Sequence, residues 1–163
     1  MAARKTPRMQ LTYEEFIKVN FENAIALAKT LERELGIEKA HEIIYRSRVE
    51  GDVAMAHAQV EGRPIGTFAE FKELMREIHG NRMARNLFEI TFPVDGDREV
   101  EFRTTKCVLA SVFRAMEEPE LGYIMCCKPD HESTLAFCPR VALRRTKTLM
   151  MGDPYCDTTY VWT

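Results

Sequence analysis

Cys107 is the first residue whose type and position could support chemistry. It follows a stretch with strand-like alternation and stands where a helical pattern begins. Because a helix N-terminus stabilises negative charge, the pKa of this thiol is expected to be lowered, so that the thiolate, with Lys106 beside it, could act as a nucleophile. The alternative is a buried structural cysteine, since free cysteine is among the residue types most often buried.

A denser cluster lies in the segment Met125–His131, which reads MCCKPDH. It places two thiols, a carboxylate and an imidazole around Pro129, which is expected to interrupt a helix. Asp130 could serve as a general acid or base, or could orient a neighbouring group. The alternative for Asp130 is an exposed position in the break, and for His131 a solvated loop is expected.

The cysteines are confined to the last 57 residues, and their spacing bears on metal binding. They are Cys107, Cys126, Cys127, Cys138 and Cys156. Structural zinc sites usually pair cysteines two to four residues apart, whereas here they are adjacent or farther apart. We therefore predict no metal, although a site assembled from distant cysteines stays open. Cys156 follows a turn at 152–154, where it is either a packing residue or part of a pocket.

The remaining sequence carries few motifs with a known mechanism. It contains no glycine-rich phosphate-binding motif and no nucleophile elbow, and no cofactor is expected. A basic run, Arg140–Lys147, lies on a predicted strand. Alternation directs Arg145 to one face and Thr146 to the other, and most of the run is expected to be solvated. One arginine could still bind a substrate carboxylate through paired hydrogen bonds.

Three helices are predicted at the start of the chain, and they belong to the scaffold that positions the candidate residues. Capping-box patterns begin two of them, at residues 12–15 and 67–70. Apolar residues at helical spacing follow each pattern. A further helix is expected between them, from Glu38 to about Gln59, with Gly51 weakening its middle.

The periodicity then changes to the alternation that is typical of strands. Residues 86–104 predict an antiparallel hairpin with a turn at 94–97. Helical patterns return between 106 and 137, and two more strands are predicted at 140–149 and 155–162. The predicted fold class is α+β, with N-terminal helices followed by a four-stranded antiparallel sheet and helices inserted between its two hairpins.

Length and composition narrow the class of protein further. The 163 residues fit a single domain over 1–163, with residues 1–10 as a flexible basic arm rather than a signal peptide. The net charge of −2 argues against a nucleic-acid partner. Because no long apolar run is present, no membrane partner is expected, and a cytoplasmic location is predicted.

The segment Lys106–Trp162 resembles the L-2-amino-thiazoline-4-carboxylic acid hydrolase family. The resemblance covers about a third of the chain. It rests, in order, on Cys107, Glu120-Leu-Gly122, Cys127-x-x-Asp130, Phe137-x-Pro139, Arg145-Thr-x-Thr-Leu149 and Gly152-Asp-x-x-Cys156-Asp157. Cys138 departs from the asparagine that is common at its position, which would change the preferred substrate if relatives contact their ligand there.

The resemblance implies a hydrolase acting on a C–N bond of a cyclic amidine or amide. In the family's named reaction, a C=N carbon is hydrated and the thiazoline ring opens to N-carbamoyl-L-cysteine. The implied catalytic residues are Cys107, which attacks or positions a water, Asp130, which moves the proton, and Cys156, which assists or completes the pocket wall. The implied substrate-binding residues are Cys127, Arg145 and Thr146.

Two other interpretations of the same residues stay open. The first is a non-catalytic, sensor-like domain that binds a small molecule or a metal in a cysteine-lined pocket. The second is an inactive homologue kept for interaction, and a homo-oligomer is compatible with every interpretation. The small-molecule partner is common to the hydrolase and the sensor, because a fold by itself does not determine function.

Overall fold

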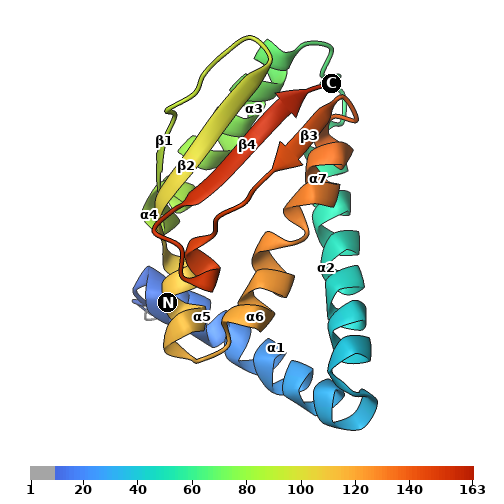
Figure 1. The fold of residues 1–163 in the computed structure, drawn as a ribbon, viewed down its shortest axis with the longest axis vertical. Coiled ribbons are helices and arrows are strands. Elements are labelled where there is room, and N and C mark those ends of the chain that lie inside the picture. Colours follow the sequence, from blue (N-terminus) through green and yellow to red (C-terminus); the bar gives the residue numbers. More distant parts are fainter. Residues whose placement is uncertain (1–9) are drawn as a thin grey trace, which may run out of the picture.

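The computed structural model describes residues 10–163, and residues 1–9 of the predicted arm lie outside this part. The chain begins with two long helices, α1 (Tyr13–Leu35) and α2 (Ile37–Val60). They meet at Gly36, whose φ of +80° is a conformation that favours glycine. As Figure 1 shows, α1 crosses one end of the molecule and α2 rises from it toward the sheet.

Both predicted capping boxes are confirmed. The Thr12 hydroxyl accepts from the backbone of Glu15, and the Glu15 carboxylate accepts in return from the backbone of Thr12. The same reciprocal bonds join Thr67 and Glu70 at the start of α3 (Phe68–Gly80). The short helix α4 (Arg82–Leu87) follows α3 and was not predicted from the sequence.

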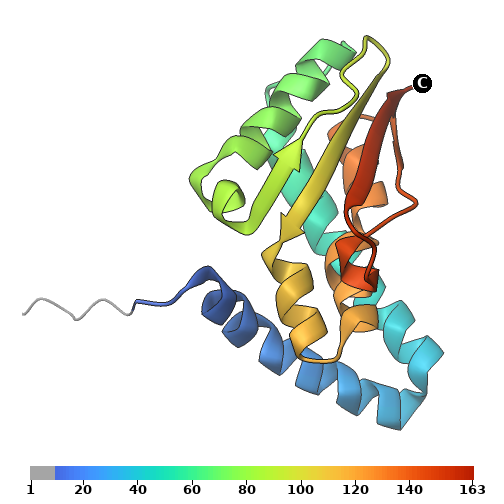
Figure 2. The same ribbon diagram turned by 60° about the vertical axis from the view of Figure 1, so that its left-hand side comes forward.

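The four strands form one antiparallel sheet in the order β1-β2-β4-β3, which confirms the predicted fold class. Their bounds are β1 Phe88–Thr91, β2 Glu99–Cys107, β3 Val141–Arg144 and β4 Cys156–Trp162. β2 and β4 are central, with Phe102 opposite Thr158. The helix α3 covers one face of this sheet (Figures 1 and 2).

The third strand is shorter than predicted, ending at Arg144 instead of residue 149. The backbone N–H groups of Thr146 and Lys147 both donate to the carboxylate of Asp157, at 2.8 Å each. Because a side chain takes these donors, they are lost to the strand ladder. The chain therefore leaves the sheet and forms a loop that ends in a short 3₁₀ turn, η2 (Leu149–Met151).

The helical region between the two pairs of strands is broken, as predicted. It comprises α5 (Val108–Ala115), α6 (Pro119–Gly122), the π-helical turn η1 (Tyr123–Cys127) and α7 (Asp130–Phe137). The N–H of Lys128 donates to the carbonyl of Tyr123 at 2.8 Å, five residues back. Such π-turns are frequent at functional sites. None of the helices in the described residues is long and apolar enough to cross a bilayer.

Two apolar cores hold the elements together. The first lies between α3 and the sheet and includes Phe71, Val100 and Tyr160. The second joins α1 to the helices after β2 and includes Phe113 and Met150. Because residues of both cores line the same cavity, the site described below lies between them.

Gly122 provides a direct test of the second core. A Cβ atom at this position would lie 2.6 Å from the sulfur of Met150 and 2.7 Å from Cγ of Phe113. Gly122→Ala is expected to lower the free energy of unfolding by about 1–3 kcal/mol, because overpacking forces neighbouring side chains to move. Urea denaturation measures the change.

The matched control is Gly51→Ala in the middle of α2. No atom lies within 4 Å of a Cβ placed there. This substitution is expected to raise the free energy of unfolding by about 0.5–1 kcal/mol, since alanine is the better helix former. Equal stability of the Gly122 variant and the wild type would contradict the packing described for α6.

Candidate functional site

A cavity of about 360 Å³ lies between the sheet, α2, α3 and α7, next to the loop after β3. It brings together predicted site residues that are up to 49 positions apart in the sequence, from Cys107 to Cys156. Five of the six predicted site residues line it: Cys107, Cys127, Asp130, Arg145 and Cys156. Most of the remaining wall is apolar, with Met75, Phe102 and Leu109 among its residues.

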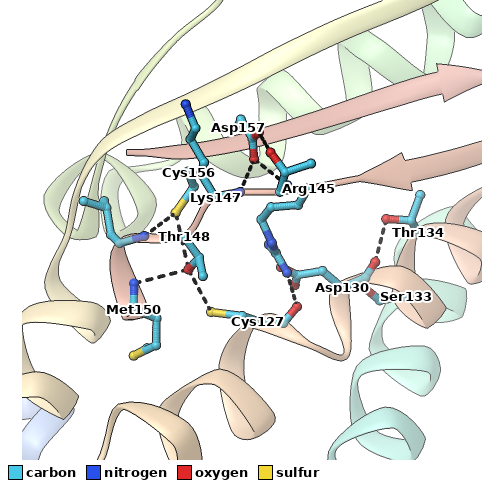
Figure 3. Close-up of polar contacts among 12 residues, drawn as sticks. Cys127, Asp130, Ser133, Thr134, Arg145, Lys147, Thr148, Met150, Cys156 and Asp157 are labelled. Carbon is cyan, nitrogen blue, oxygen red and sulfur yellow. Dashed lines mark hydrogen bonds and ion pairs between the residues drawn. The ribbon is translucent and has the colours of Figure 1, made fainter. Parts of the chain in front are cut away.

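Asp130 and Arg145 form an ion pair at the wall of this cavity (Figure 3). Nη1 of Arg145 donates to Oδ2 of Asp130 at 2.7 Å, and its other terminal nitrogen donates to the carbonyl oxygen of Cys127. The Arg145 side chain is only 7% exposed. The guanidinium therefore fixes the carboxylate against the end of the π-turn.

The carboxylate of Asp130 faces the cavity rather than the outer surface. The Asp130 side chain is 43% exposed, but its exposed part lines the cavity. The carboxylate is therefore surrounded by protein on most sides. Burial raises the pKa of Asp130, although the charge of Arg145 and its hydrogen bond act in the opposite direction. A carboxyl group with a raised pKa is suited to take up and release protons at moderate pH.

Cys107 lies at the predicted junction, but its pKa is shifted in the direction opposite to the prediction. It is the N-cap residue of α5, and its sulfur accepts from the N–H of Ala110 at 3.4 Å. Burial nevertheless raises the pKa of this thiol to about 11, because desolvation of the thiolate outweighs the bonds at the helix start. Lys106 is exposed and pairs with Glu89 at 3.4 Å.

Cys127 and Cys156 lie on either side of the Thr148 hydroxyl (Figure 3). The Cys127 sulfur is 4.0 Å from Oγ1 of Thr148, and the Cys156 sulfur is 3.8 Å from it. The N–H of Leu149 also donates to the Cys156 sulfur at 3.3 Å. Burial raises the pKa of Cys127 to about 12, so that this thiol is neutral.

Thr146 is the one predicted site residue that does not line the cavity. Its side chain is exposed, and its hydroxyl donates to Asp157 at 2.5 Å. The residue therefore holds the loop after β3 in place. Of the other residues in the cysteine-rich half, Cys126 lines the cavity and Cys138 is buried in the first core. His131 is exposed, as predicted, but it lies in helix α7 and not in a loop.

Thr148, His79 and Tyr160 also belong to the site, although the sequence did not predict them. All three are buried or partly buried, and His79 and Tyr160 line the cavity. The repeated threonine of the Arg145-Thr-x-Thr pattern was a signal for Thr148. The inward position of Tyr160 follows from strand alternation, but nothing local distinguishes His79 from other residues near a helix end.

The positions of the potential metal ligands bear on metal binding. Within residues 10–163, no three His, Cys, Asp or Glu side chains are grouped closely enough to hold a metal ion. The charged pair at the cavity wall, Asp130 and Arg145, instead binds each other and the backbone carbonyl of Cys127. Their arrangement is suited to proton transfer within a small, largely apolar space.

Among solved structures, the chain is similar to the crystal structure of the phenol-responsive sensory domain of the transcription activator PoxR with phenol. The alignment has 19% sequence identity, covers 96% of this chain and 77% of the other, and gives a TM-score of 0.54. At this level of identity, the likeness shows a shared fold. No curated protein matches the sequence.

The family relationship extends well beyond the segment that carries the motifs. Residues 14–160 match the family model described as L-2-amino-thiazoline-4-carboxylic acid hydrolase. The match includes the N-terminal helices, for which the sequence offered no motif, and confirms the predicted resemblance. The chain therefore belongs to the L-2-amino-thiazoline-4-carboxylic acid hydrolase family.

Proposed function

We propose that the protein is a small-molecule hydrolase that adds water to the C=N or C=O carbon of a cyclic amidine or amide. The proposal combines the family relationship with one observation, the Asp130 carboxylate that lines a cavity and is fixed by Arg145. 2-Amino-thiazoline-4-carboxylate, which the family description names, is the first substrate to test.

The reaction needs one group that carries a proton in both directions. Asp130 takes a proton from water as the water oxygen bonds to the ring carbon, and the π-electron pair of the C=N or C=O bond moves onto its nitrogen or oxygen. When this pair re-forms the double bond, the bond from the carbon to a ring heteroatom breaks, and the Asp130 carboxyl group returns the proton to that heteroatom. The raised pKa of Asp130 supports both halves of this cycle, since it brings the carboxyl group closer to neutral pH.

We assign the attack to water, because the Cys107 sulfur accepts a hydrogen bond from the N–H of Ala110 and has no base bonded to it within the described residues that would take its proton. With a pKa of about 11, only about one Cys107 in ten thousand is a thiolate at neutral pH. The thiols then serve as neutral walls of the cavity. Arg145 donates through both terminal nitrogens to protein oxygens, which favours a positioning role over binding of a substrate carboxylate.

A second function is supported by the fold. The sensory domain of PoxR shares this fold and was crystallised with phenol, and the cavity wall here is also largely apolar. A binding domain of this kind would take a small molecule without converting it. Titration calorimetry with phenol and with the thiazoline, followed by analysis of the recovered thiazoline, separates the two functions.

Asp130→Asn is expected to lower kcat for thiazoline opening by about 10²–10⁴-fold, because the amide cannot carry the proton. Liquid chromatography of the product gives the rate. The control is Asp95→Asn, which removes a carboxylate bound to Lys72 and Arg76 away from the cavity. Activity of the Asp130 variant equal to that of the control would contradict the assigned role.

Cys107→Ser is expected to keep kcat within about tenfold of the wild type, because water rather than this thiol attacks the substrate. Serine also preserves a side-chain acceptor for the N–H of Ala110, as N-cap residues commonly do. Cys107→Ala should retain activity but lower the free energy of unfolding by about 1 kcal/mol, through loss of the cap. Complete loss of turnover in both folded variants would establish covalent catalysis by Cys107 instead.

A further inference from the structure

His79 and Tyr160 are two polar residues of the cavity whose roles the proposed reaction leaves open. Tyr160 is only 6% exposed, and both side chains line the cavity. Within the described residues, the Tyr160 hydroxyl and Nε2 of His79 make no hydrogen bond to the protein. Among the described side chains, only Glu132 has a fully buried polar atom without a partner, so these two atoms keep accessible surface and can bind a molecule held in the cavity.

The hydrogen-bonding role of the His79 ring is fixed by its backbone contact. Nδ1 lies 2.8 Å from the carbonyl oxygen of Met75, so Nδ1 carries the proton and donates it. Burial lowers the pKa of His79 and keeps the ring neutral. Nε2 is therefore an acceptor with a free lone pair.

The Tyr160 hydroxyl is a donor throughout the neutral range. Burial raises the pKa of this phenol above its ordinary value, and the charge of Asp130 acts in the same direction. The Tyr160 ring is fixed by edge contacts with Phe71 and Phe102, at centroid distances of 5.2 and 5.4 Å. Rotation of the hydroxyl about its C–O bond is the main freedom left to this group.

The two groups flank the same aromatic ring. The centroid of His79 lies 5.2 Å from that of Phe102, and the centroid of Tyr160 lies 5.4 Å from it. The rings that carry the acceptor and the donor thus pack against the same phenylalanine, and both residues line the same largely apolar cavity. A flat ring that carries both a donor and an acceptor is the kind of molecule that such a cavity could bind.

We propose that His79 and Tyr160 form a recognition pair for a planar ring with an N–H group beside a carbonyl or imine, as in cyclic amides, ureas and amidines. The ring N–H donates to Nε2 of His79, and the Tyr160 hydroxyl donates to the carbonyl oxygen or imine nitrogen. The pair rests on the proposed function for its substrate class, because the carbon joining these two groups is the carbon that water attacks.

Binding of two stable cyclic ureas tests the pair separately from turnover. Benzimidazol-2-one carries the N–H groups and the carbonyl, whereas 1,3-dimethylbenzimidazol-2-one keeps the carbonyl alone. Titration calorimetry with the full-length protein is expected to show about tenfold tighter binding of the N–H probe, since each hydrogen bond contributes about that factor.

The two variants should have different effects. His79→Leu, which conserves volume closely, is expected to abolish the preference for the N–H probe. Tyr160→Phe is expected to weaken both probes by about three- to tenfold and to leave the preference intact, because only the donor to the carbonyl is lost. Tyr155→Phe is the control, since its hydroxyl contacts Lys147 outside the cavity and binding should not change.

Three results would overturn the pair. The first is equal binding of both probes, or of neither, to the wild type. The second is a preference that survives His79→Leu, which would mean that the methyl groups are rejected by shape. The third is unchanged binding in Tyr160→Phe. Loss of thiazoline hydrolysis alone, with the expected binding pattern, would count against the hydrolase proposal and leave the pair supported.

Discussion

The ion pair between Asp130 and Arg145 is the interaction on which the site depends. A buried charge is tolerated only when an opposite charge and further hydrogen bonds compensate it. Arg145 meets this condition through the Asp130 carboxylate and the carbonyl of Cys127. One guanidinium thus joins the loop after β3 to the end of the π-turn and the start of α7, which lie 18 and 15 positions earlier in the chain.

The loop after β3 shows why the family motifs in this region are dispersed. Asp157 binds the backbone N–H groups of Thr146 and Lys147, and Asp153 binds that of Thr148 at 2.8 Å. These bonds draw the chain out of the sheet and place the Thr148 hydroxyl between two cysteine sulfurs. Most of the polar motif residues between Arg145 and Asp157 therefore have a structural task, which the spacing alone does not reveal.

The sequence was sufficient where structure follows from local chemistry. The capping boxes, the apolar periodicity and the turn residues predicted the fold class, and the break at Pro129 was also anticipated. The early end of β3 was not predictable, because it depends on Asp157, thirteen residues beyond Arg144. The site was only partly predictable for the same reason: His79 and Tyr160 come to the cavity from α3 and β4 through tertiary packing.

Burial has different consequences for Cys107 and Asp130, the two residues to which the sequence assigns chemistry. Desolvation favours the neutral form of every acid, so it raises the pKa of both thiols and carboxylates. For Cys107 the shift leads away from neutral pH, to about 11. For Asp130 the same effect leads toward neutral pH, while Arg145 limits the shift and keeps the carboxylate available. A cavity that suppresses thiolate chemistry therefore favours proton transfer by its carboxylate.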